Sequence, residues 1–122
     1  MSKQCYTIEG NSNKVVIEKI IGYCNEIERM IDRFGNNFEA FNSDLAFKLA
    51  GGACIIQIGE LTTRLTDDFK NQHSEIDWNS LKKASNEHLH DYENVKLDVD
   101  WQILTEDIPA LKKSLQAILE VM

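Results

Sequence analysis

Two of the three histidines in this 122-residue chain, His88 and His90, lie two positions apart within LKKASNEHLHDYENV (residues 81–95). Imidazole titrates near neutral pH, so a histidine can both take and give a proton during a reaction. Residues two apart on a helix point about 200° away from each other, so we expect the two rings to face different sides. They are therefore poor joint ligands, and the H-E-x-x-H spacing of helical zinc sites is missing. We expect no metal and no cofactor.

A helical stripe around His90 carries groups that could act on a phosphodiester. Asn86 lies four residues before His90 and Lys83 lies seven before it, so an amide, an imidazole and an ammonium share one face. The imidazole could take a proton from a ribose 2′-OH or give one to the leaving oxygen. The alternative is a partly exposed histidine at a helix end without a chemical role. His88 is expected to serve packing or to lie on the surface.

Apolar residues at three- and four-residue spacing predict the helices that hold this stripe. The first helix begins at Asn13 and ends before a stop signal, Gly35-Asn36-Asn37. Ser43 is the expected N-cap of a long second helix over residues 44–71. The Gly51-Gly52 pair inside it indicates close approach of another backbone, with a kink as the alternative.

The second half of the chain predicts two more helices. Asp77 is the expected N-cap of a helix over residues 78–92, and Pro109 should bend a last helix over residues 100–121. No stretch alternates apolar and polar residues for long enough to form a strand. We therefore predict an all-α antiparallel bundle of four to five helices. The buried side of the third helix is expected to carry four residues, Leu81, Ala84, Leu89 and Tyr92.

The length predicts a single helical domain, residues 13–122, after a flexible tail of residues 1–12. Trp78 and Trp101 are expected to anchor the core or an interface rather than to stack on bases.

Composition limits how this chain could meet nucleic acid. Its net charge of −7 lacks the broad positive potential of a protein that binds RNA or DNA over its whole surface. Any RNA contact must therefore be local, or must depend on a partner or an oligomer. We find no window of about 18 apolar residues and no signal peptide, so we expect no membrane role. Three widely spaced cysteines without a CxxC pair predict free thiols and a cytoplasmic protein.

Four segments follow one another in a familiar order: IIQIGELTTRL (55–65), HSEIDW (73–78), NEHLHDY (86–92) and VDWQILTEDIPALKKSLQAIL (99–119). They resemble, in turn, I-I-G-E-A-x-x-R-L, H-P-E-I-P-W, the R-N-x-x-x-H-x-Y motif, and a closing W-x-x-x-x-x-D-L-P-x-L helix. These are signatures of the HepT-like branch of the HEPN superfamily. The resemblance runs from Asn13 to the end of the chain.

This resemblance implies a helical bundle that dimerises and places two copies of the motif at a shared cleft. It also implies a metal-independent endoribonuclease acting as a toxin, which a minimal nucleotidyltransferase antitoxin neutralises by adding AMP to the motif tyrosine. By position, His90 matches the catalytic histidine, Asn86 the motif asparagine and Tyr92 the modifiable tyrosine. Glu60 would face the motif cleft and hydrogen-bond Asn86, or would be a simple surface glutamate.

Ser85 stands where the motif has its arginine. An arginine would neutralise the charge that builds up in the transition state, whereas serine offers one neutral hydroxyl. Lys82 or Lys83 could substitute, although Lys83 lies about 10 Å from His90 along the helix axis. We therefore expect activity on single-stranded RNA to be weakened or lost. The alternatives are a catalytically dead HEPN module that binds the antitoxin and a plain helical scaffold.

Overall fold

The computed structural model describes the backbone of residues 2–122 and the side chains of residues 12–122. The described residues form helices and no strand, which confirms the predicted all-α class. A 3₁₀ turn, Tyr92–Asn94, and a π segment, Ile103–Asp107, lie between helices. The α-helices are α1 (Ser2–Phe34), α2 (Phe38–Ser43), α3 (Leu45–Thr62), α4 (Asp67–Gln72), α5 (Trp78–His90), α6 (Leu97–Gln102) and α7 (Ile108–Glu120).

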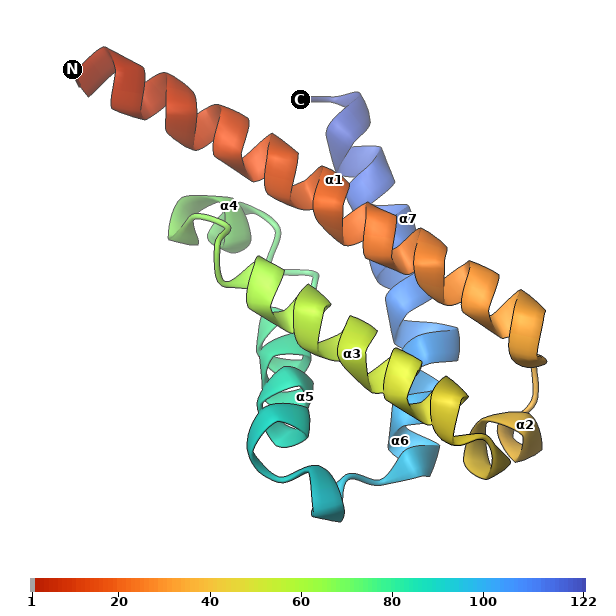
Figure 1. The fold of residues 1–122 in the computed structure, drawn as a ribbon. Coiled ribbons are helices and arrows are strands. Elements are labelled where there is room, and N and C mark those ends of the chain that lie inside the picture. The colour runs from red at the N-terminus through yellow and green to blue at the C-terminus, as the bar shows by residue number, and fades with distance from the viewer. Residues whose placement is uncertain (1) are drawn as a thin grey trace.

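Helix α3 is the centre of the bundle (Figure 1). It packs against α1 on one side and α5 on the other, while α7 lies along α1. By length and composition α3 could cross a membrane, so the expectation that no such window exists was wrong. The core helix of a soluble protein can be equally long and apolar, and α3 packs against both α1 and α5. The largest fully buried side chains come from α1, α2, α3 and the C-terminal helices: Ile17, Ile20, Ile27, Phe41, Phe47, Ile58, Leu104, Ile108 and Leu115.

The first helix ends where the stop signal predicted. Gly35 has a φ of 118°, and its N–H donates to the Ile31 carbonyl at 2.8 Å. The backbone of residues 2–12 belongs to α1, so helix is present where we expected a loose tail. The division of the chain into a tail, residues 1–12, and a domain, residues 13–122, stays a prediction.

Ser43 was wrongly predicted as the N-cap of the second helix. It is the last residue of the short α2, and its hydroxyl donates to the Glu39 carbonyl at 2.7 Å. The cap of α3 is Asp44, whose carboxylate accepts the Ala46 and Phe47 N–H groups at 2.9 and 3.2 Å. Serine and aspartate are both common N-caps, but the Ser43 hydroxyl is already hydrogen-bonded within α2, so Asp44 caps α3.

The long second helix predicted over residues 44–71 is two helices, α3 and α4, separated by a turn at residues 63–66. Thr66 caps α4 by accepting the Phe69 N–H at 3.2 Å. Asn13 of α1 holds this turn through two hydrogen bonds of 3.1 Å, one to the Thr66 backbone and one to its hydroxyl. A contact between residues 53 positions apart therefore ends α3, and no local pattern reveals it.

The third predicted helix is confirmed at its start and shorter at its end. Asp77 accepts the Ser80 N–H at 3.0 Å and so caps α5, which ends at His90 rather than Tyr92. The last helix begins earlier than expected, as α6, and the π segment interrupts it. Pro109 follows directly in the first turn of α7, where a missing N–H is tolerated.

The glycines of α3 lie in close contact with other elements, but at Gly51 and Gly52 the neighbours are side chains and not the backbone that we predicted. A Cβ added at Gly51 would lie 2.9 Å from Leu104 Cδ1, and one at Gly52 would lie 2.9 Å from His88 Nδ1. The tightest place is Gly59, where it would lie 2.2 Å from Ser85 Cβ and 2.9 Å from the Leu81 carbonyl oxygen. Helix α5 therefore crosses α3 at a distance that only glycine permits.

We expect Gly59→Ala to lower the free energy of unfolding by roughly 1–3 kcal/mol, because α5 must move away from the added methyl. Gly22→Ala is the matched control, since a Cβ there meets nothing within 4 Å. It should raise stability by up to about 1 kcal/mol through helix propensity. Urea unfolding followed by circular dichroism measures both. Equal stability of the Gly59 variant and the wild type would contradict the close crossing.

Candidate active site

His90, Asn86 and Lys83 are exposed on α5 and line one shallow hollow. This is the shared face that the sequence predicted. Within the described residues, the His90 and Asn86 side chains have no protein hydrogen-bond partner. The lining of the hollow also includes Asn79, Lys82, Glu87 and Asp91. An open imidazole beside an amide and two ammonium groups could contact a phosphodiester.

His88 faces the opposite way and is buried, so of the two predicted alternatives, packing and surface, the structure shows packing. Only 7% of it is exposed, and its Nε2 lies 3.0 Å from the carboxylate of Asp100 in α6. Asp100 is itself buried. Sequence reasoning missed this partner. The sequence does contain a signal for it, because Asp100 shares the helical spacing of the apolar residues Leu97, Trp101 and Leu104.

Ser85, the position of the missing arginine, lies under α3 and not on the hollow. It is fully buried, and its hydroxyl donates to the Ile56 carbonyl at 3.2 Å. The buried side of α5 therefore runs through Ser85 and His88, with Leu81 and Ala84 partly buried beside them. The prediction was wrong for Leu89 and Tyr92, which are 48% and 51% exposed. At the α3 crossing the buried side of α5 therefore carries two polar residues, the small Ser85 and the paired His88, in place of the two apolar residues that we predicted.

Glu60 of α3 faces α5, but its partner is Lys82 rather than Asn86. The Lys82 ammonium donates to the Glu60 carboxylate at 2.8 Å. This hydrogen bond and the charge of Lys82 lower the pKa of Glu60 below its ordinary range. Lys82 is thus engaged. Among the described residues Lys83 has no ion-pair partner. Of the two lysines that line the hollow, it is therefore the one whose ammonium is not engaged.

Tyr92 lies just beyond α5 in the 3₁₀ turn. Half of the residue is exposed, and its ring centroid is 6.2 Å from that of His88. Trp78 packs near Phe69 and donates from Nε1 to the His73 carbonyl at 3.1 Å, while Trp101 packs on Phe41 and Phe47. Both tryptophans anchor the fold, as predicted.

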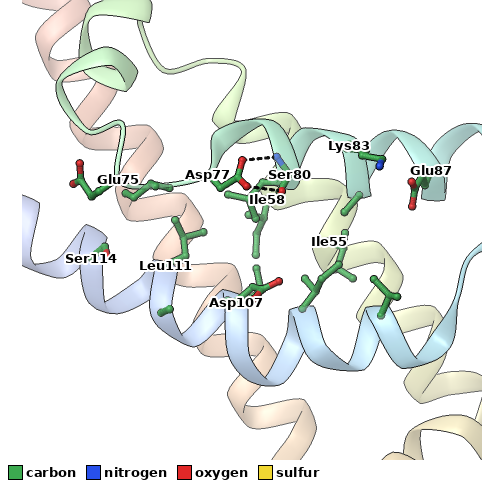
Figure 2. A pocket seen from close by; sticks show the side chains of 17 residues that line it. Ile55, Ile58, Glu75, Asp77, Ser80, Lys83, Glu87, Asp107, Leu111 and Ser114 are labelled. Atoms are coloured by element: carbon green, nitrogen blue, oxygen red, sulfur yellow. Dashed lines mark hydrogen bonds between the residues drawn. The ribbon is translucent and has the colours of Figure 1, made fainter.

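A second groove lies between α5 and the C-terminal helices, with Ile55 and Ile58 of α3 at its floor (Figure 2). Its lining holds four carboxylates, of Glu75, Asp77, Glu87 and Asp107, and one ammonium, that of Lys83. Burial, together with the charges of Glu106 and Asp77, raises the pKa of Asp107. So acidic a groove repels phosphate groups.

Sequence comparison places these features in a family. The family model described as Ribonuclease HepT-like matches residues 20–118. The chain belongs to the HepT-like ribonuclease family of the HEPN superfamily. A relative named "Putative RNase", from Caldanaerobacter subterraneus subsp. tengcongensis, is 29% identical over 78% of this chain and 86% of its own length.

A second relative of this HepT-like chain is named "Probable ribonuclease HepT" and comes from Thermococcus cleftensis. It is 35% identical over 62% of this chain and 68% of its own length. No solved structure matches at comparable stringency.

The metal-ligating and thiol side chains offer little further chemistry. Over residues 12–122 no three His, Cys, Asp or Glu side chains gather closely enough to hold a metal ion. Cys24 and Cys54 are free thiols. Burial raises the pKa of both, that of Cys24 to about 12, so neither is an activated nucleophile. The Cys5 side chain lies outside the described residues.

The ion pair between Glu60 and Lys82 should appear in the pH dependence of stability. Since the pair lowers the pKa of Glu60 in the folded state, its contribution is present above the unfolded pKa and is lost as pH falls through the folded one. We expect Lys82→Met to reduce the loss of thermal stability between about pH 5 and pH 2. Lys113→Met, at an exposed lysine of α7, is the control and should keep the wild-type pH dependence. Identical pH profiles for the wild type and Lys82→Met would contradict the pairing.

Proposed function

We propose that this protein is a toxin-type, metal-independent endoribonuclease on single-stranded RNA, with activity weakened by the serine at position 85. The observation that carries the proposal is the exposed stripe of Lys83, Asn86 and His90 on α5 in a chain of the HepT-like ribonuclease family. The exposed imidazole of His90 supports activity, whereas the buried and neutral residue at position 85 limits it, so the proposal expects slow cleavage.

In this proposal His90 acts as general acid and base. It takes the proton of the ribose 2′-OH, which attacks the adjacent phosphorus, and protonates the leaving 5′ oxygen. Asn86, one helical turn away, orients the phosphate or the imidazole. Metal ions have no part in the proposed steps.

In the HepT-like motif an arginine supplies positive charge, and in this chain a lysine must supply it instead. Lys83 lies about 10 Å along the helix axis from His90, a distance that its long side chain could partly cover. An ammonium is a single point charge without the paired donors of a guanidinium, so the transition state is less well stabilised. Removing such a donor commonly lowers rates about 10²-fold or more.

We further propose that the active form is a homodimer, in which two such faces share a cleft. Large apolar side chains remain exposed on α3 and near the end of α5: Leu45 at 63%, Leu49 at 51% and Leu89 at 48%. Apolar side chains left in solvent are candidates for burial in a second copy. A dimer would also double the number of lysines near each phosphate.

The second candidate function is a catalytically dead interaction module, and the burial of Ser85 favours it. In both cases we propose a cytoplasmic protein without a membrane role, paired with a minimal nucleotidyltransferase antitoxin. The partner would transfer AMP to Tyr92, whose exposed position leaves its phenol accessible.

Cleavage of a fluorescent single-stranded RNA in EDTA tests the enzyme. We expect slow cleavage by the wild type and a loss of at least about 10²-fold in His90→Ala, since the general base is removed. Lys83→Ala should lose about tenfold, equivalent to about 1.4 kcal/mol of transition-state stabilisation. Lys113→Ala on α7 is the matched control and should cleave like the wild type.

Lys83→Arg complements this series, because it adds a guanidinium at an exposed position. The net charge stays the same, so faster cleavage is expected if the paired donors of a guanidinium are what the site lacks. Ser85→Arg is a poorer test, since the arginine side chain does not fit into the close contact between α3 and α5 and would disturb the fold. Folded wild type that leaves RNA intact at enzyme excess, with Lys83→Arg equally inert, would exclude the ribonuclease and favour the interaction module.

Modification of Tyr92 tests the partner. Coexpression with a nucleotidyltransferase encoded beside this gene should add AMP, seen as an intact-mass increase that Tyr92→Phe abolishes. Tyr23→Phe in α1 is the control, because Tyr23 is partly buried and distant in sequence from the motif. AMP found on another residue in the wild type would contradict the assignment of Tyr92.

A further inference from the structure

His88 and Asp100 form a buried polar pair in a chain that otherwise buries few charged groups. His88 is 7% exposed and Asp100 is 5% exposed, and the two side chains meet at 3.0 Å. Nε2 of His88 lies within hydrogen-bond distance of the Asp100 carboxylate. Because an ionised carboxylate can only accept, the tautomer of His88 that pairs with it carries a proton on Nε2. A buried charge is costly unless it is paired, so each residue depends on the other.

The pair joins the two ends of the segment that carries the candidate chemistry. His88 lies in the last turn of α5 and Asp100 in α6, twelve positions apart. Between them lie His90 and Tyr92. The hydrogen bond therefore closes a loop that contains both of these residues, while the ring of Tyr92 lies near that of His88.

Gly52 of α3 provides the surface on which the His88 ring lies. A Cβ at residue 52 would lie 2.9 Å from Nδ1 and 3.0 Å from Cε1 of His88. Nδ1 is buried without a hydrogen-bond partner within the described residues. The ring is thus confined by α3 on one side and by the Asp100 carboxylate at its Nε2.

We propose that His88 and Asp100, resting on Gly52, are positioning residues for His90 and Tyr92. Because residues 88 and 90 point about 200° apart, holding the His88 ring inward directs His90 into the solvent hollow. A hydrogen bond is directional and fixes the rotation of the last turn, which apolar packing alone does not. The role in catalysis rests on the proposed function, whereas the structural lock does not.

The competing interpretation is that the pair only fills space. In that case an apolar pair of similar volume would serve as well, since such replacements are often neutral or stabilising. The double substitution His88→Leu with Asp100→Val distinguishes the two interpretations, because it keeps apolar packing at both positions and removes the directional hydrogen bond. Gly52→Ala displaces the His88 ring while both hydrogen-bonding side chains stay in the chain. Gly22→Ala is its control, because a Cβ at residue 22 meets nothing within 4 Å.

The test compares amide hydrogen exchange over residues 89–94 and the imidazole NMR signals of His90. We expect the double variant to stay folded, yet to exchange at least about tenfold faster in this segment than the wild type while the α1 core is unchanged. Gly52→Ala should show the same local change and shifted His90 signals. Asp100→Asn keeps a hydrogen-bond acceptor and should retain most of the protection.

Wild-type exchange and unchanged His90 signals in the folded double variant would overturn the proposal. Should the double variant not fold, Gly52→Ala decides, and wild-type behaviour there overturns the proposal equally. None of these readouts requires RNA. An inert wild type would therefore contradict the proposed function while leaving the positioning result intact, and the reverse outcome is just as distinguishable.

Discussion

The close crossing of α3 and α5 is the constraint on which the rest of this structure depends. Gly59 and Ser85 touch where a Cβ on residue 59 would lie 2.2 Å from that of Ser85, and Gly52 receives the His88 ring seven residues earlier on α3. Two helices this close must exclude large side chains from the contact. The crossing therefore fixes which side of α5 is buried and leaves Lys83, Asn86 and His90 facing out.

This constraint has a chemical consequence at position 85. The position at which the HepT-like motif has an arginine holds here a small serine side chain that is buried beneath α3. Positive charge on the α5 surface comes instead from two lysines, and Glu60 engages one of them. In a chain of net charge −7, the two lysines of α5 line one shallow hollow, and the groove on the other side of Lys83 is acidic.

Local signals predicted those parts of the fold that local chemistry decides. The αL glycine after α1 and the Asp77 cap of α5 were both identified correctly, because each acts through its own neighbouring backbone. Ser43 and Asp44 are adjacent residues that can both cap, and only the packing of α2 chose between them. The break after Thr62 depends on Asn13, far away in the chain.

The sequence by itself determined the helical class, the family and the stripe that joins Lys83, Asn86 and His90, because helical periodicity places residues on faces without reference to other elements. Only the tertiary structure decided that Ser85 is closed off, that Lys82 belongs to Glu60, and that His88 has a buried acid as its partner. Each of these is a contact between different helices. Helical periodicity gives the face that a residue occupies on its own helix, but it does not give the side chain of another helix that faces it.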